Sequence, residues 1–354
     1  MASIFKQQIL QPEFHQTVQE TLNPAFMPFY KKHNSQNHYD VFNGDADGIC
    51  ALHQFRLAYP AADAELITGV KRDITLLARI KDVTGSQITV MDVSMHSNMD
   101  DLAQILEAEN DVLYIDHHFA GEIPRSSRLK HYIDPSPEKC TSLIVDDMLD
   151  GKFRLWALVG AFGDNLHASA EAIAAEMSLS AEDTKKLRKI GELVNYNGYG
   201  AHLQDLYFPP DQLFRVIQQY QNPLDFYAQS KTLKTLDQGF SSDMDQALSQ
   251  SECKRLGKNK VYRFPDSAWA RRVSGVFANL KARENPEGAH ALITENSDET
   301  LRISVRAPLL DKKNADTLCR SFPGGGGRAA AAGINALPAH LLDSFLEAFA
   351  NTFN

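Results

Sequence analysis

Short hydrophobic segments alternate with longer amphipathic segments between His38 and about Ser136. The short segments are rich in β-branched and aromatic residues, whereas the longer ones repeat apolar residues at helical spacing. This alternation indicates βαβ units, and hence a parallel sheet with both faces covered by helices. The predicted strands cover residues 39–42, 64–70, 86–93, 111–116 and 129–134, and the predicted helices cover residues 48–59, 98–109 (with Ser97 as N-cap), 141–149 and 153–162.

The pattern becomes helical near Ser169 and stays helical to about Asp237. Strand-like runs resume only after a polar stretch in which Leu256 is the one large apolar residue. The predicted fold class is therefore α/β, with a parallel-sheet N-terminal domain and a smaller α/β C-terminal domain. The predicted divisions are an amphipathic extension at 1–37, a first domain with its helical region at 38–237, a linker at 238–257 and a second domain at 258–354.

The size and charge of the chain narrow the classes of partner. Its 354 residues and 39.5 kDa exceed what one hydrophobic core usually accommodates, which agrees with two domains. There are 45 acidic and 36 basic side chains, a formal charge of −9. Coating a long duplex takes clustered cations, so we exclude that partner, whereas a small phosphate ligand remains open.

No signal for export or membrane insertion stands out. The N-terminal sequence lacks the pattern of a secretion signal, and the longest apolar run, residues 155–162, is far shorter than the roughly 20 residues that cross a bilayer. The four cysteines have no CxxC spacing and are interpreted as reduced thiols. We expect a cytoplasmic protein with no membrane partner.

Carboxylates and histidines follow the ends of several predicted apolar elements. Because the carboxyl ends of parallel strands meet at one edge of a sheet, these groups are expected to converge there. Like charges so close together require a cation, and oxygen and imidazole donors without thiolates suit Mn²⁺ or Mg²⁺ better than a structural zinc. The residues expected to converge are Asp45, Asp47, Asp92, His117 and His118, while Asp116 and Asp164 also stand at the ends of apolar elements.

Each of these signals alone also has a structural explanation. The sequence Asp45–Gly48 is common in turns, and adjacent histidines occur by chance. An Asp after a strand, such as Asp92 or Asp164, usually forms an Asx turn or caps a helix. The joint occurrence of all these groups in one α/β domain favours a metal site.

Four motifs carry a family resemblance. NGDADGI, VMDVS, IDHHF and GAFGD resemble, in that order, the motifs of the DHH phosphoesterase superfamily. SVRAP and GGGGRAAAAG resemble the DHH-associated C-terminal domain of RecJ-like exonucleases and nanoRNases. The resemblance covers roughly Tyr39 to the C-terminus, and it implies an active site in the cleft between the two domains.

The resemblance also implies a set of metal ligands for two Mn²⁺ ions, with Mg²⁺ as the alternative. Asp45 would bind one ion and Asp47 the other, and Asp92 would bridge them. His117 and Asp164 would complete the second site. Two such ions would activate a water molecule for in-line attack on phosphorus.

Further roles follow from the same resemblance. His118 would face the scissile phosphate, and Asp116 would orient His117 as a carboxylate behind a metal-bound histidine. The implied catalytic set is Asp92, His117 and His118. Asn43 stands where RecJ-like members tend to place an Asp; its amide oxygen is a candidate ligand that adds no charge.

The C-terminal motifs indicate substrate binding. Four consecutive glycines can place successive backbone N–H groups around an anion, although a flexible surface loop is the alternative. Arg328 follows them where the family commonly has His, and Arg306 lies in the SVRAP motif. We expect both guanidinium groups to bind the nucleotide away from the cleaved bond. The predicted substrate-binding residues are His118, Arg306, Gly324, Gly325, Gly326, Gly327 and Arg328.

The leading prediction is a Mn²⁺-dependent phosphodiesterase that hydrolyses short single-stranded oligonucleotides, or linear dinucleotides such as pGpG, to 5′-mononucleotides. The compact length supports it, because processive exonucleases of the family carry an additional nucleic-acid-binding domain. The alternatives are a cyclic-dinucleotide phosphodiesterase, an adenosine bisphosphate phosphatase and, from another class, a non-catalytic DHH nucleotide-binding scaffold. The oligomeric state is open, with a homodimer as one alternative.

Overall fold

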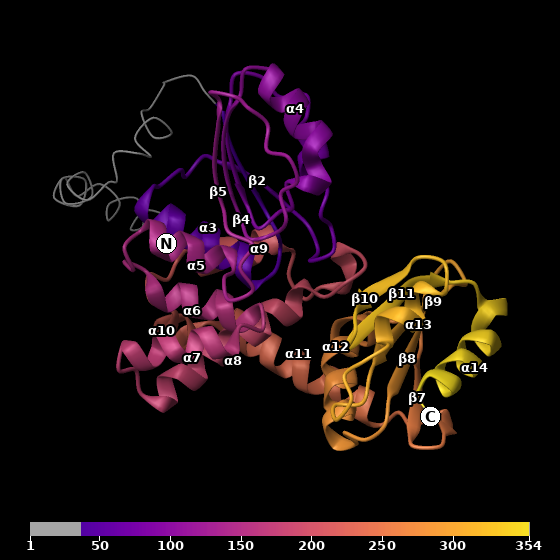
Figure 1. The fold of residues 1–354 in the computed structure, drawn as a ribbon. Coiled ribbons are helices and arrows are strands. Elements are labelled where there is room, and N and C mark those ends of the chain that lie inside the picture. Colours follow the sequence, from indigo (N-terminus) through magenta and orange to yellow (C-terminus); the bar gives the residue numbers. More distant parts are fainter. Residues whose placement is uncertain (1–36, 354) are drawn as a thin grey trace. The chain divides into compact units, whose positions relative to one another are not determined.

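The computed structural model describes residues 37–353, which pack into two compact units (Figure 1). Unit 1 comprises the described residues up to Asn195 together with Pro209–Leu233. Unit 2 comprises Tyr196–Phe208 and the described residues from Lys234 onward. Each unit is considered by itself below.

The sheet of unit 1 has five parallel strands in the order β2-β1-β3-β4-β5, as the alternating pattern predicted. The connection from β1 runs to one side of the sheet and the connection from β3 to the other, so right-handed crossovers put their helices on opposite faces. Burial on both faces explains why β3 is buried at every position. The strands are β1 (His38–Phe42), β2 (Glu65–Thr68), β3 (Gln87–Met91), β4 (Asp111–Asp116) and β5 (Leu129–Ile133).

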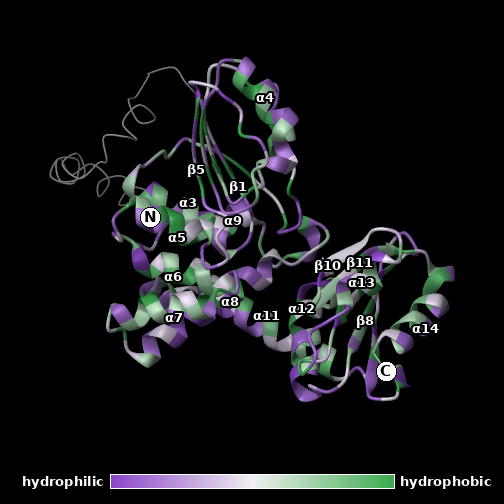
Figure 2. Ribbon diagram, viewed as in Figure 1, coloured by the Kyte–Doolittle hydropathy of each residue, from purple (hydrophilic) through white to green (hydrophobic). Residues whose placement is uncertain are grey.

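The helices of unit 1 lie close to their predicted positions, but one cap differs. The predicted N-cap Ser97 is wrong, because the helix begins after Asn98 and the Ser97 hydroxyl group instead bonds to that of Ser94. The helices are α3 (Ala46–Ala58), α4 (Met99–Glu107), α5 (Thr141–Met148), α6 (Arg154–Gly163), α7 (His167–Glu176), α9 (Pro210–Ile217) and α10 (Pro223–Gln229). Figure 2 shows hydrophobic stretches along the strands and along helices beside them, such as α5 and α6.

Two of the three divisions between the units fall inside helices rather than in a linker. Helices α8 (Ala181–Gly198) and α11 (Lys231–Leu248) each contribute residues to both units. The segment 238–257, predicted as a linker, holds most of α11 and strand β6 (Lys254–Leu256). The strand was missed because it is a short edge strand with exposed Lys and Arg side chains, a composition typical of a loop. The predicted extension, residues 1–37, lies outside the described residues except for Asn37.

Unit 2 contains a six-stranded mixed sheet in the order β10-β11-β9-β8-β7-β6, which agrees with the predicted α/β C-terminal domain. Two hydrophobic clusters form the core of unit 2. One includes Phe345 and Phe349, and the other includes Phe264 and Phe277. Its other elements are β7 (Asn259–Phe264), α12 (Ala268–Glu284), β8 (His290–Glu295), β9 (Leu301–Arg306), α13 (Ala315–Arg320), β10 (Gly325–Arg328), β11 (Ala331–Leu337) and α14 (Leu342–Thr352).

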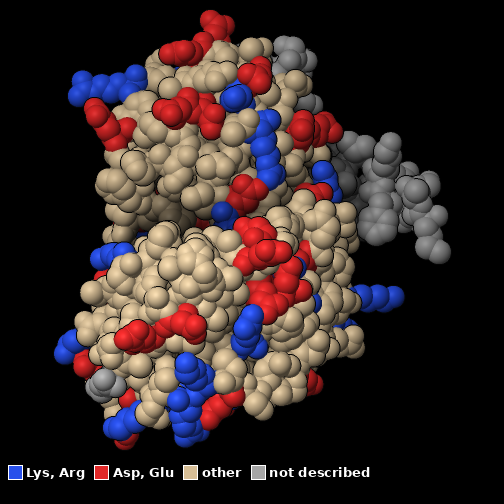
Figure 3. Space-filling model, turned by 90° about the vertical axis from the view of Figure 1, so that its right-hand side faces the viewer, with Lys and Arg blue, Asp and Glu red and all other residues tan. Residues whose placement is uncertain are grey.

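None of the helices within residues 37–353 combines the length and the apolar character that crossing a bilayer requires. On the face drawn in Figure 3, Lys and Arg side chains are scattered among Asp and Glu. This face therefore presents both signs of charge to the solvent.

Candidate metal centre

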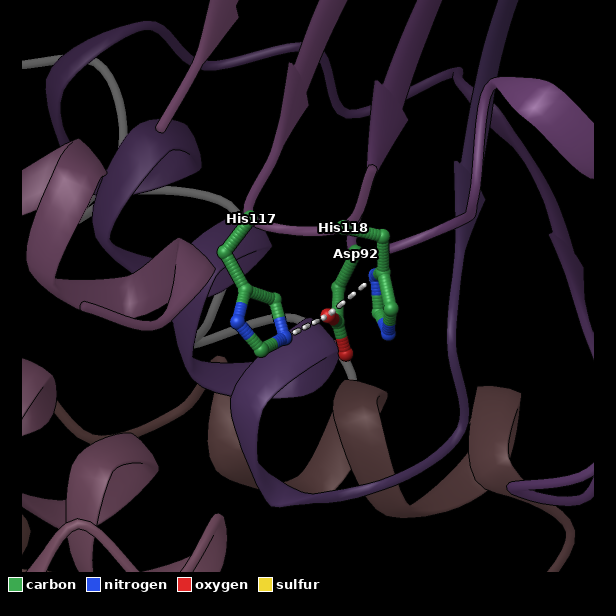
Figure 4. Close-up of side chains that lie close together, drawn as sticks. All are labelled: Asp92, His117 and His118. Carbon is green, nitrogen blue, oxygen red and sulfur yellow. Dashed lines mark ion pairs between the residues drawn. The ribbon is translucent and has the colours of Figure 1, made fainter. Parts of the chain in front are cut away.

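The predicted site residues of unit 1 come together at the carboxyl edge of its sheet. Asp45 follows β1, Asp92 follows β3, and the histidine pair follows β4. His117 Nε2 lies 3.4 Å from Asp92 Oδ1, and His118 Nδ1 lies 3.9 Å from the same oxygen (Figure 4). Together, Asp92, His117 and His118 form a cluster whose ligand atoms all lie within 4.8 Å of one another.

Asp92 is the most constrained of these residues. It is only 2% exposed, and its backbone has φ of 59°, a left-handed conformation that Asp and Asn tolerate better than most residues. Burial raises the pKa of Asp92 well above its ordinary value, and the negative charges of Asp47 and Asp45 raise it further. In the metal-free protein this carboxyl group therefore favours its protonated form, and a bound cation would favour the carboxylate.

His117 is oriented by the backbone of the segment before α5. Its Nδ1 lies 3.2 Å from the carbonyl oxygen of Lys139, which can only accept, so Nδ1 carries the proton in this hydrogen bond. Nε2 then faces Asp92 Oδ1 at 3.4 Å and Asp164 Oδ2 at 3.9 Å. A neutral imidazole fixed in this tautomer presents a lone pair where a metal ligand is needed.

Asp116 orients His118 rather than the predicted His117. Its Oδ1 accepts a hydrogen bond from His118 Nδ1 at 2.7 Å, whereas from His117 it accepts one from the backbone N–H, at 2.9 Å. This hydrogen bond raises the pKa of His118 above its ordinary value, although burial opposes it. The side chain of His118 is 45% exposed, so a cationic or hydrogen-bonded imidazole meets the solvent here, as contact with a phosphate would require.

Asp47 has a structural role at the start of α5. Its Oδ2 accepts from the backbone N–H of Thr141 at 2.8 Å, and its Oδ1 accepts from that of Ser142 at 2.7 Å. A carboxylate stabilises a helix N-terminus, where N–H groups have no partner within the helix. Thr141 also donates its hydroxyl group to Asp92 at 3.2 Å, which ties the start of α5 to the centre.

Asp164 caps the end of α6 and has one oxygen toward each side of the site. Its Oδ1 lies 3.5 Å from Lys71 Nζ and its Oδ2 lies 3.9 Å from His117 Nε2. Burial raises the pKa of Asp164 to about 6, and the neighbouring charge of Asp47 contributes. The carboxyl group is therefore costly to ionise even beside the Lys71 ammonium group, and a further cation would offset this cost.

Two residues in the site were missed by the sequence analysis, Lys71 and Asn195. Lys71 Nζ lies 2.5 Å from Asp45 Oδ2 and 3.2 Å from Asn195 Oδ1. Burial alone would raise the pKa of Asp45, but the Lys71 ammonium group outweighs this and holds it below its ordinary value. The available signal is a lysine shortly after β2, a strand that ends at the same edge of the sheet.

The residues present fit a divalent cation. Asp116 Oδ2 and Asn43 Oδ1 are buried without a hydrogen-bond partner in the protein, and Asn43 is only 7% exposed. Ligands of one ion lie about 3 Å apart, since each bond is about 2.1 Å, and the Asp92–His117 separation of 3.4 Å is close to this. Oxygen and imidazole donors without a thiolate suit Mn²⁺ or Mg²⁺.

The predicted substrate-binding residues lie in unit 2. Arg306 ends β9 and is held by Asn279, whose Oδ1 accepts from its Nε at 2.7 Å. Arg306 pairs with Ala331, and Ala331 pairs with Arg328, so both guanidinium groups leave the same face of the sheet on either side of a small residue.

The glycine-rich segment differs from the predicted anion nest. Gly325, Gly326 and Gly327 form β10, paired with β11, rather than a loop of convergent N–H groups. A Cβ at Gly325 would lie 1.7 Å from the carbonyl oxygen of Cys319, and one at Gly327 would lie 2.5 Å from Cα of Ala332. Close packing of the backbone therefore explains glycine at these two positions.

Known proteins share this fold at low sequence identity. No protein-family model and no curated protein matches the chain. Among solved structures, an exonuclease RecJ bound to manganese matches with a TM-score of 0.58 and 16% identity, over 96% of this chain and 94% of that one. The PF0399 DHH domain matches with a TM-score of 0.60 and 14% identity, over 96% of this chain and 92% of that one. The pGpG-specific phosphodiesterase PggH from Vibrio cholerae matches with a TM-score of 0.53 and 14% identity, over 90% of this chain and 99% of that one.

These matches extend over nearly the whole chain, including both sheets. They show that the chain has the fold of the DHH superfamily, as its motifs predicted.

Proposed function

We propose that this protein of DHH fold is a divalent-metal-dependent phosphodiesterase that hydrolyses short single-stranded oligonucleotides or linear dinucleotides to 5′-mononucleotides. The observation that carries the proposal is the cluster of Asp92, His117 and His118 at the carboxyl edge of a parallel sheet. Manganese is the ion we favour, and the RecJ structure named above, which is bound to manganese, supports this choice.

The side chains of the cluster divide the work between metal binding and phosphate binding. Asp92 and the Nε2 atom of His117 would hold the cation, which would supply Lewis acidity and an activated water molecule. His118, held by Asp116 and partly exposed, would donate a hydrogen bond to a phosphate oxygen. Asp164, with one oxygen 3.9 Å from His117 Nε2, would complete the ligands of this cation.

Two observations support a short substrate: the proteins that share the fold, and the distribution of charge. Two of the structures that share the fold are an exonuclease and a pGpG-specific phosphodiesterase, both of which cleave phosphodiesters. Arg306 and Arg328 supply two cations in unit 2, whereas the chain as a whole carries a charge of −9. Two local cations suit a few phosphates better than a long polyanion.

The other hypotheses remain distinct outcomes of one experiment. A cyclic-dinucleotide phosphodiesterase or an adenosine bisphosphate phosphatase would use the same cluster on a different substrate, and a non-catalytic scaffold would bind nucleotide without turnover. The location in the cytoplasm, the homodimer and the position of the active site between the domains stay predictions.

The test is hydrolysis of a substrate panel by metal-free protein supplied with Mn²⁺ or Mg²⁺. The panel holds pGpG, a pentanucleotide, a long single strand, a cyclic dinucleotide and adenosine bisphosphate, with products identified by mass. We expect fastest release of mononucleotides from the dinucleotide or pentanucleotide, and release slower by at least about a hundredfold from the matched Asp92→Asn variant. Turnover of the long strand with dinucleotides untouched would overturn the substrate assignment, and binding without any turnover would support the scaffold.

A further inference from the structure

The Lys71 ammonium group lies among the carboxylates where a cation of the site is expected. It contacts three oxygens: Asp45 Oδ2 at 2.5 Å, Asn195 Oδ1 at 3.2 Å and Asp164 Oδ1 at 3.5 Å. An ammonium group has three N–H donors, so these oxygens match its hydrogen-bonding capacity. The side chain is 27% exposed, and Asp45 is almost fully buried.

The backbone of Lys71 is held by Asn43. The Asn43 side-chain amide donates to the Lys71 carbonyl oxygen at 3.1 Å, from a position only 7% exposed. An aspartate at position 43 could not donate this hydrogen bond while ionised. The amide at 43 and the lysine at 71 therefore form one arrangement: Asn43 positions the turn that carries Lys71, and adds no charge that would attract a second ion.

The remaining carboxylates are divided between two positions. Asp45 contacts Lys71 and the Gly48 N–H group, and Asp47 accepts two backbone N–H groups. On the other side of Asp164 from Lys71, His117 Nε2 lies 3.4 Å from Asp92 Oδ1 and 3.9 Å from the second oxygen of Asp164. Asp164 thus spans the ammonium position and the position that would suit an ion.

We propose that Lys71 takes the place of a second metal ion in this centre. The chain then binds one divalent ion, at Asp92, His117 and Asp164, and the ammonium group supplies the other positive charge that faces a phosphate. An ammonium group and a second divalent ion so close together would repel each other strongly. This inference deepens the proposed function, since it rests on the site binding a divalent ion, and it replaces the expectation of two Mn²⁺ ions.

The test measures the number of bound ions without any substrate. Metal-free protein is titrated with Mn²⁺ by calorimetry, and the bound ion is examined by electron paramagnetic resonance, which distinguishes an isolated Mn²⁺ from a spin-coupled pair. We expect one isolated ion per chain in the natural protein. Lys71→Met, which keeps the length of the side chain and removes its charge, should bind two ions as a coupled pair.

Matched variants separate charge from packing. Lys71→Arg keeps the charge and should bind one ion, as should Lys81→Met, which removes an exposed lysine of unit 1. Asn43→Asp with Lys71→Met should bind the second ion more tightly than Lys71→Met alone, because it adds a carboxylate. A coupled pair in the natural protein would overturn the inference, and this readout decides it even where Lys71→Met fails to fold.

The outcomes also separate the inference from the function it rests on. Two ions with activity would overturn only the role of Lys71. A chain that binds no Mn²⁺ would overturn both, and one ion without hydrolysis would leave the role of Lys71 supported and the proposed reaction refuted.

Discussion

Asp164 is predicted to destabilise the metal-free protein at neutral pH, and replacing it by Asn should remove this cost. Its side chain is 23% exposed, and burial with the charge of Asp47 raises its pKa from 3.8 to about 6. Each pKa unit corresponds to about 1.36 kcal/mol, so the ionised carboxylate costs the folded protein about 3 kcal/mol. The contact with Lys71 lowers the pKa of Asp164 and is already contained in this value.

The sign of the pH dependence follows from the raised pKa. The folded protein binds the Asp164 proton more tightly than the unfolded chain does, so stability is greatest below the unfolded pKa and falls as the pH rises through about 6. About half of this contribution of about 3 kcal/mol to the free energy of unfolding should be lost between about pH 5 and pH 8. Asp164→Asn has no such proton and should not show this loss.

The assay is urea unfolding of chelator-treated protein from about pH 5 to pH 8, for the natural protein and the variant. The difference in the free energy of unfolding should grow with pH by about 1 to 2 kcal/mol in favour of Asp164→Asn. Asp63→Asn, which removes an exposed carboxylate, is the control and should follow the natural protein. Added Mn²⁺ should stabilise the natural protein more than the variant, because the ion offsets the buried charge.

Parallel pH profiles of the natural protein and Asp164→Asn would refute the reasoning. Such a result would mean that the carboxylate is hydrated or already paired in the metal-free protein. A variant that is less stable at every pH would show instead that the contact of the Asp164 carboxylate with Lys71 stabilises the fold more than its burial costs.

Three further predictions concern the same chain. Asn tolerates the φ of 59° at position 92, so Asp92→Asn should keep the backbone conformation. The variant should weaken Mn²⁺ binding and lower the rate of hydrolysis by at least about a hundredfold, and a fully active variant would refute the role of Asp92. Asp116→Asn should lower the pKa of His118 in the metal-free protein, measured by NMR titration, and an unchanged pKa would contradict the contact at 2.7 Å. The double variant Arg306→Ala and Arg328→Ala should raise KM by about tenfold or more with Mn²⁺ affinity unchanged, and an unaltered KM would exclude these arginines from substrate binding.

The fold was largely predictable because its signals are local and repeated. Alternation of short apolar runs and helical runs identified the parallel sheet, and acidic residues at strand ends indicated where ligands converge. The misses share a cause: they depend on contacts between distant segments. Lys71 meets Asp164 and Asn195, residues that follow far along the chain, and no local pattern marks such a contact.

The glycine-rich segment shows the same limit in another form. A run of glycines is compatible with a nest, a flexible loop or a closely packed strand, and only the partner strand β11 decides among them. The orientation of Asp116 toward His118 likewise depends on how the loop after β4 turns, which the Asp-His-His order does not specify.

The contact between Asp47 and the start of α5 bears on how variation at this site would be read in a cell. Because the Asp47 carboxylate holds two backbone N–H groups of another helix, its replacement removes support from the fold as well as from the centre. Asp92 and Asp164 are the reverse, since burial raises the pKa of each and makes its ionised form costly to the fold. A library scored for both protein abundance and turnover should therefore separate inactive variants into scarce ones at position 47 and abundant ones at positions 92 and 164.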